Sequence, residues 1–194
     1  MTFEILPFGD GHTALNDDDA EGLIPAYIST RGELFEAEQR NIAEALLQDV
    51  PTIDRLLDDS YLRNLHRSMF DRVWRWAGTY RIRETNIGID PKHISTAIRN
   101  LVEDARMWVN FEENSDDVAV RFHHRLVSIH AFPNGNGRHG RIYADYLAQA
   151  IGRSPFTWGF HLGLSTEDLR ARYLRALRNA DNGNLDELLI FARS

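Results

Sequence analysis

The sequence contains no cysteine among its 194 residues. This absence excludes disulfide bridges, thiolate nucleophiles and cysteine-ligated metal sites. The sequence also lacks any run of about 18 apolar residues, so we expect no segment to span a membrane. Residues 1–10 have neither a basic start nor an apolar stretch. We therefore expect no secretory signal and a cytoplasmic location.

An excess of positive charge is absent as well. The chain has 22 lysines and arginines against 29 aspartates and glutamates, which gives a formal net charge of −7 at pH 7. A general nucleic-acid binder needs a basic surface to neutralise phosphates. The composition therefore argues against general nucleic-acid binding but permits a local basic site.

The hydrophobic pattern of the chain predicts an all-α protein. Hydrophobic residues make up 43% of the chain and charged residues 26%, as is ordinary for one soluble domain. Apolar residues recur at i, i+3 and i+4, the spacing of helices that face a core. This pattern predicts helices over residues 33–49, 61–76, 94–111, 116–129, 137–150, 166–178 and 185–191, the fourth of them capped by Ser115 or Asp116.

Two segments depart from the helical pattern. Residues 1–32 are rich in glycine, proline and aspartate, so we interpret them as an N-terminal arm that precedes a single domain over residues 33–194. Residues 80–91 are short, β-prone and interrupted by Gly88 and Pro91. They predict a small β-hairpin, which we call the flap.

Residues 130–141 read His-Ala-Phe-Pro-Asn-Gly-Asn-Gly-Arg-His-Gly-Arg. They combine the residue types needed to hold a polyphosphate and to remove a proton from a group beside it. The ordinary pKa of a histidine, near 6.5, makes His130 a candidate general base. A Gly-Asn-Gly turn lets successive N–H groups point at phosphate oxygens. Arg138 and Arg141 lie on one face of the following helix, near its N-terminus, where two cations oppose the helix dipole. An anionic ligand would remove that conflict.

Each of these residues also has a purely structural interpretation. His130 could be a helix-terminal histidine that the helix dipole favours. The glycines could form a plain turn, and Arg141 could pair with Asp145 one turn later on the surface. Phe132 is best interpreted as a packing anchor under the loop.

The segment resembles the signature of the Fic (Fic/Doc) family, His-x-Phe-x-(Asp/Glu)-Gly-Asn-Gly-Arg-x-x-Arg. One position departs, because Asn134 stands where the pattern has an acid. Residues 65–81 and the arm add to the likeness, which is nearest to the subgroup called mobile mystery protein B. The resemblance implies a Fic-fold helical bundle with a short β-hairpin flap. The matching residues are His130, Phe132, Gly135, Asn136, Gly137, Arg138 and Arg141.

The resemblance implies a protein adenylyltransferase that moves AMP from ATP to a Ser, Thr or Tyr hydroxyl of a target protein. His130 would then be the base that deprotonates this hydroxyl. Position 134 would hold Mg²⁺, and an asparagine there should bind the ion less well than an acid and reduce or alter catalysis. The residues implied to bind the phosphates are Gly135, Asn136, Gly137, Arg138 and Arg141.

The flap and the arm receive roles by the same resemblance. The flap would pair with the main chain of the target, and its structural alternative is an ordinary hairpin edge. Ser29 and Glu33 partly fit an inhibitory pattern in which the glutamate pairs with the second arginine. Their structural alternative is a plain helix start. The flap residues implied to bind the target are Thr85, Asn86, Ile87, Gly88 and Ile89.

Two rival functions stay open. A transferase could use another donor, such as UTP or GTP, because nothing in the sequence identifies the base. Alternatively, the chain could be a catalytically weak Fic-fold interaction module of a toxin–antitoxin-like system, with an antitoxin or regulatory partner. Asn134 favours the second alternative, whereas His130, Arg138 and Arg141 oppose it.

Overall fold

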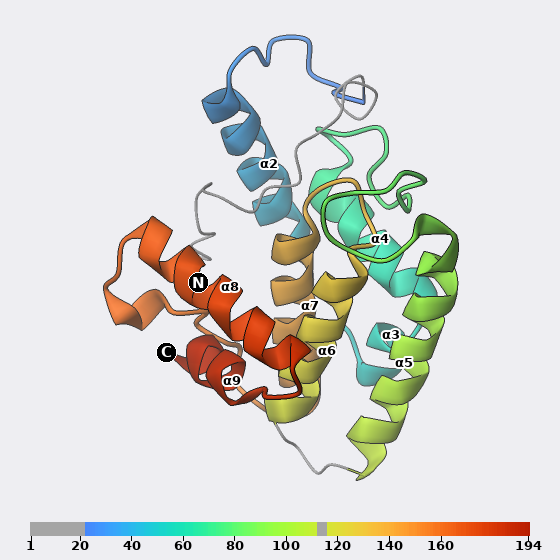
Figure 1. Ribbon diagram of the computed structural model, residues 1–194. Helices are drawn as coiled ribbons and strands as arrows, with labels where there is room; N and C mark the ends of the chain where they lie inside the picture. Colours follow the sequence, from blue (N-terminus) through green and yellow to red (C-terminus); the bar gives the residue numbers. More distant parts are fainter. Residues whose placement is uncertain (1–21, 112–115) are drawn as a thin grey trace.

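The computed structural model describes residues 22–111 and 116–194 as a bundle of helices (Figure 1). These residues form no sheet, which confirms the all-α class. Two short 3₁₀ helices, η1 (Pro91–His93) and η2 (Phe160–Leu162), lie between α-helices. The α-helices are α2 (Arg31–Ala45), α3 (Ile53–Leu56), α4 (Asp59–Phe70), α5 (Ile94–Phe111), α6 (Asp116–Ile129), α7 (Asn136–Ala150), α8 (Thr166–Asp181) and α9 (Asp186–Arg193).

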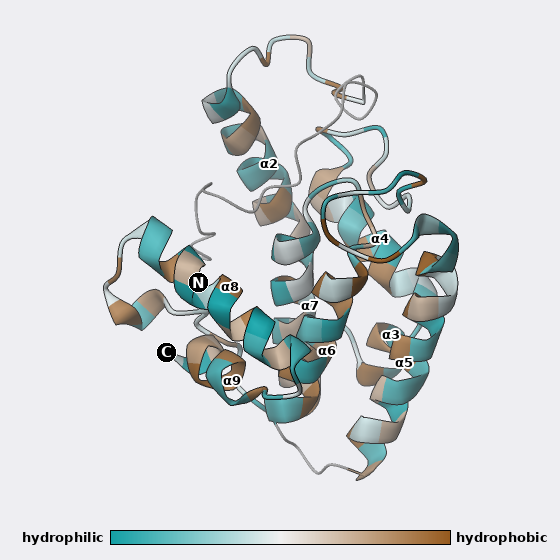
Figure 2. Ribbon diagram, viewed as in Figure 1, coloured by the Kyte–Doolittle hydropathy of each residue, from teal (hydrophilic) through white to brown (hydrophobic). Residues whose placement is uncertain are grey.

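Helices α6 and α7 pack together at the centre of the bundle. Helix α9 packs on α6 and on α8 at one side, while α5 covers α6 from the other and α2 lies on α4. The helices alternate hydrophilic and hydrophobic residues along their surfaces (Figure 2), as expected when each buries one face. The loop that joins α6 to α7 holds residues 130–135 and emerges from the middle of the molecule.

Close contact between α6 and α7 fixes the position of this loop. A Cβ atom added to Gly140 would lie 2.8 Å from Val127 Cγ1, so the glycine lets the two helices approach. One turn further along, the rings of Phe122 and Tyr143 stack with their centroids 4.7 Å apart, and both side chains are fully buried. The loop is therefore held at both ends by rigid, buried helices.

The predicted bounds of α5 and α6 agree with the structure, while others differ in detail. Helix α4 ends at Phe70 rather than at residue 76, because residues 73–75 pair with residues 22–24 instead: the Val73 carbonyl accepts from the Ile24 N–H at 2.9 Å. The short helix α3 was not predicted. Asp116 opens α6, whereas Ser115 and residues 1–21 of the predicted arm lie outside the described residues.

The predicted β-hairpin in the flap is wrong. Residues 81–90 form an irregular loop whose backbone bonds to the end of α6 and not to itself. The Arg81 N–H donates to the Ala131 carbonyl at 3.0 Å, and the Ile89 N–H donates to the Ile129 carbonyl at 3.4 Å. These bonds take the backbone groups that a hairpin ladder would need. Finally, none of the described helices is long and apolar enough to cross a membrane.

Candidate active site

His130 lies directly after α6 in an unusual backbone conformation. Its φ is +53°, in the left-handed region that side chains other than glycine rarely adopt. The residue is 6% exposed, and its carbonyl accepts from Arg81 Nε at 2.6 Å. Such strain persists only where surrounding contacts enforce it, and it is often found at functional sites. The turn here redirects the chain from α6 into the loop.

The environment of His130 keeps its ring neutral. Burial lowers the pKa of His130 to about 4, and the positive charge of Arg81 acts in the same direction, while a hydrogen bond with the Val127 backbone opposes them. A ring nitrogen that donates to a carbonyl leaves the other nitrogen of a neutral imidazole as an acceptor. At neutral pH the ring is therefore in the form that a general base requires.

Two side chains hold the shape of the loop. The buried amide of Asn136 accepts from the Phe132 N–H at 2.9 Å and donates to the Phe132 carbonyl at 2.7 Å. His66 of α4 accepts from the Gly78 N–H at Nδ1 and contacts the Asn134 carbonyl at Nε2, each at 3.0 Å. Because Nδ1 accepts, Nε2 must carry the proton in the neutral ring. Asn136 and His66 therefore use side-chain hydrogen bonds to fix the loop backbone.

Burial lowers the pKa of His66 well below its usual range, so the ring stays in this neutral form. The ring also stacks on Phe132 with centroids 3.7 Å apart, which confirms the expected packing role of Phe132. Sequence reasoning missed His66, because its position on the apolar face of α4 indicates only packing.

The two glycines of the turn differ in what surrounds them. Gly135 has φ +79°, and an added Cβ would lie 2.6 Å from the Phe70 ring, so the fold itself requires glycine. Gly137 has nothing within 4 Å of an added Cβ. It lies in the first turn of α7, where N–H groups have no partner within the helix. Open space at such a terminus suits an anion.

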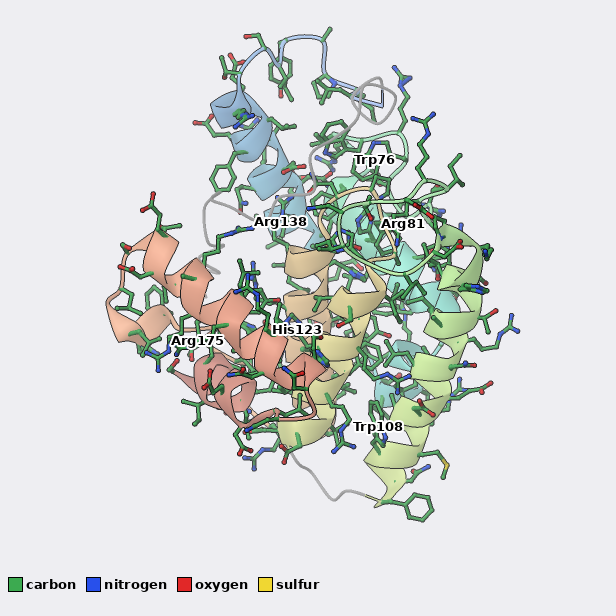
Figure 3. All side chains as sticks on the ribbon, in the orientation of Figure 1. Trp76, Arg81, Trp108, His123, Arg138 and Arg175 are labelled. Atoms are coloured by element: carbon green, nitrogen blue, oxygen red, sulfur yellow. The ribbon has the colours of Figure 1, made fainter. Side chains whose placement is uncertain are left out.

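Arg138 forms a buried ion pair that the sequence did not reveal. Its Nη1 lies 2.8 Å from Glu38 Oε2, and the other oxygen of Glu38 accepts from Trp74 Nε1 at 2.7 Å. Glu38 is 2% exposed and comes from α2, beneath which Figure 3 labels Arg138. The guanidinium also lies over the Phe70 ring. Glu38 thus restrains one of the two arginines expected to bind phosphate.

Arg141 lies one turn further along α7 and is partly buried. Its guanidinium lies 5.6 Å from the centre of the Tyr173 ring, and burial lowers its pKa. The carboxylate of Asp145, the expected surface partner, is buried and accepts from the Phe156 N–H at 3.0 Å and Trp158 Nε1 at 3.1 Å. Asp145 therefore anchors the segment after α7 and is no surface partner.

Asn134 fits Mg²⁺ poorly. Its side-chain oxygen accepts from the N–H of Gly135 at 2.5 Å. This oxygen is neutral, whereas Mg²⁺ prefers carboxylates in near-octahedral geometry. Among residues 22–111 and 116–194, no group of three His, Asp or Glu side chains could hold a metal ion. The chain therefore offers Mg²⁺ one weak ligand at this position.

The flap touches the histidine through Gly88. Its φ is +105°, and a Cβ added there would lie 2.6 Å from His130 Cβ. Ile87 is 46% exposed next to it, and Thr85 Oγ1 donates to the Ile87 carbonyl at 2.6 Å. The flap thus places an exposed apolar side chain near the buried histidine.

Glu33 lies at the start of α2 and completes a capping box. Its carboxylate accepts from the Ser29 N–H at 2.8 Å, the Ser29 hydroxyl at 3.0 Å and the Thr30 N–H at 2.9 Å. These hydrogen bonds, that of the Ser29 backbone first, lower the pKa of Glu33. The contacts are those of a helix start. The glutamate that reaches a signature arginine is Glu38.

Residues 56–148 match the Fic/DOC family. The chain is 30% identical over 136 residues, 66% of its length and 70% of the relative's, to a Sinorhizobium fredii protein named "Probable protein adenylyltransferase y4lH". The chain belongs to the Fic/DOC family.

Solved structures agree in fold. The BepC protein of Bartonella tribocorum with bound AMPPNP superposes with a TM-score of 0.69 at 17% identity, over 92% of this chain and 97% of that one. An N-terminal Fic domain from Bartonella quintana with bound ADP gives a TM-score of 0.65 at 19% identity, over 87% and 86%. At these identities the likeness extends to the fold alone.

Proposed function

We propose that the protein is an adenylyltransferase that moves AMP from ATP to a Ser, Thr or Tyr hydroxyl of a target protein. The observation that carries the proposal is the neutral, buried His130 between the flap and the open first turn of α7. The adenylyltransferase name of the Sinorhizobium relative and the adenine nucleotides in two structural neighbours support the choice of ATP.

In the proposed reaction, the unprotonated nitrogen of His130 takes the proton of the target hydroxyl. The hydroxyl oxygen then forms a bond to the α-phosphorus of ATP. The bond from that phosphorus to the bridging oxygen breaks, and pyrophosphate leaves with the electron pair. AMP stays attached to the target through a phosphodiester. Catalysis of this kind depends on positioning and on stabilising charge.

The phosphates would bind at the start of α7. The backbone N–H groups of residues 135–137 and the positive end of the helix dipole attract anions there. Arg141 adds a cation on the same helix, and Arg138 adds a second one that is paired with Glu38. Asn134 is the residue that would contact Mg²⁺, and its neutral oxygen fits the ion poorly.

A catalytically weak interaction module is the second candidate. Two observations favour it: the neutral Asn134 at the metal position and the buried pairing of Arg138 with Glu38. The first weakens the binding of Mg²⁺, and the second neutralises one guanidinium. Both therefore reduce the positive charge available to a polyphosphate. In such a module the phosphate site would remain but turnover would be slow.

The test is incubation of the protein with cell lysate and ATP labelled on the α-phosphate, followed by mass identification of adducts. We expect a +AMP adduct on a hydroxyl side chain, and none with the variant His130→Ala. Parallel reactions with UTP and GTP identify the donor. Adducts that persist in His130→Ala, or no adduct with any nucleotide despite nucleotide binding, would favour the module instead.

A further inference from the structure

Arg81 makes an unusual set of contacts for a single side chain. It is 5% exposed, although it lies at the base of the exposed flap, where Figure 3 labels it. Its Nε donates to the His130 carbonyl at 2.6 Å, and its Nη1 donates to the Arg83 carbonyl at 2.8 Å. Its Nη2 donates to the Ile89 carbonyl at 2.5 Å and reaches the Ile129 carbonyl at 3.5 Å.

These carbonyls belong to two different parts of the molecule. Ile129 ends α6 and His130 follows it, at a terminus where carbonyl groups have no partner within the helix. Arg83 and Ile89 are the two sides of the flap. One guanidinium therefore links both sides of the flap to the residue that carries the base. A cation at the C-terminus of a helix is also favourable for the helix dipole.

Only an arginine can make this arrangement. The guanidinium is planar and presents five N–H donors in a fixed fork, whereas a lysine presents one rotatable ammonium. Burial lowers the pKa of Arg81, and the nearby acids Asp90 and Glu84 oppose this shift. The hydrogen bonds of Arg81 go to backbone carbonyls and not to these acids.

We propose that Arg81 is a positioning residue that fixes the flap, and with it the bound target chain, in register with His130. The proposal rests on the proposed function, in which the flap holds the target hydroxyl beside the base. Gly88 supports it, because an added Cβ there would lie 2.7 Å from Arg81 Nη2 and 2.6 Å from His130 Cβ. The guanidinium, the flap backbone and the histidine thus form one packed unit.

The experiment compares Arg81→Met and Arg81→Lys with the wild type, and with Arg99→Met as a matched control on the exposed face of α5. With either Arg81 variant we expect kcat/KM for the target protein to fall about 100-fold, as for a misplacement of roughly 1 Å. The KM for ATP should change little, because the phosphate site lies on α7. Arg99→Met should leave both parameters unchanged.

Two further measurements do not depend on turnover. Hydrogen exchange over residues 82–90 should become faster in both Arg81 variants and stay unchanged in Arg99→Met. The pKa of His130, followed by NMR of the ring, should rise in Arg81→Met but stay low in Arg81→Lys, which keeps the charge. The lysine variant thus separates the loss of charge from the loss of the linking hydrogen bonds.

The outcomes separate the two proposals. If the wild type transfers no nucleotide while the exchange and pKa results appear, the proposed function fails and the link between flap and histidine stands. If flap exchange is unchanged in folded Arg81→Lys, or if KM for ATP and for the target rise together, the positioning role is overturned. If Arg81→Met does not fold, Arg81→Lys alone decides between these results.

Discussion

The loop between α6 and α7 and the flap meet at His130 but are built in opposite ways. In the loop, residues 130–136, the amide of Asn136 bonds twice to the Phe132 backbone four residues away, and nearly every residue is buried. The flap, residues 81–90, is largely exposed and is held by the side chain of Arg81 and two backbone bonds to the loop region. The loop is thus fixed by its own hydrogen bonds and by the buried residues around it, whereas the flap depends on its contact with the loop.

This difference suits two different tasks. A phosphate site has to present the same donors to every nucleotide, so a buried, self-bonded loop is appropriate. A target-binding segment has to accept a protein chain, and exposed backbone with few internal bonds can pair with it.

Gly135→Ala should break the loop. The left-handed φ costs about 1–3 kcal/mol for a side chain, and the contact with the Phe70 ring adds to that cost. We expect a fall in the free energy of unfolding of at least this size, measured by urea denaturation. Gly137→Ala is the control, because its Cβ meets no protein atom; it should keep its stability and lose nucleotide affinity. Equal stability of the two variants would contradict the comparison.

Gly88→Ala should damage the flap without unfolding the bundle. The added Cβ would collide with His130 and Arg81, so the flap must shift away from the base. We expect transfer to the target to fall by about 100-fold, with a stability loss smaller than that of Gly135→Ala. Kinetics with target and denaturation curves check both parts. A stability loss as large as that of Gly135→Ala would show that the flap is as much a part of the core as the loop.

Asn134→Asp should strengthen the binding of Mg²⁺ by the loop. A carboxylate in place of the amide restores the charge that Mg²⁺ prefers, so we expect about a tenfold rise in transfer rate at limiting Mg²⁺, in proportion to the added transition-state stabilisation. The measurement is the transfer rate against Mg²⁺ concentration for both proteins. If the wild type is already fast and the substitution does not change its rate, the hypothesis that Asn134 reduces catalysis is wrong.

The pH dependence of transfer should reflect the buried base. His130 is active when neutral, and its pKa lies at about 4, so protonation removes activity only as pH falls through about 4. We expect kcat/KM to stay nearly constant between pH 7 and pH 5, measured with a target that is stable over this range. A loss of activity centred near pH 6.5 would indicate a solvated histidine and a flap that does not cover it.

Glu33→Ala should have the smallest effect on chemistry. Its carboxylate caps α2 through Ser29 and Thr30, so we expect a slightly lower melting temperature and unchanged ATP affinity and transfer rate. Nucleotide titration and thermal melting measure the two effects. A rise in ATP affinity would instead support the inhibitory role that the sequence pattern suggested.

The sequence pattern predicted the features that depend on residues close together in the chain. The periodicity of apolar residues located α5 and α6, and the signature located the loop that joins α6 to α7. The contacts that complete the site come from far along the chain: His66 reaches Asn134 across 68 residues and Glu38 reaches Arg138 across 100. The hairpin prediction failed because β-propensity gave way to bonds with the end of α6.

The buried pair of Glu38 and Arg138 indicates which residues a fragment needs in order to fold. The match to the family covers residues 56–148 and leaves out α2. A fragment cut to those limits would lose Glu38, the counter-ion of Arg138, together with the packing of α2 on α4. We therefore expect such a fragment to fold poorly, so expression of the minimal protein should start ahead of residue 38.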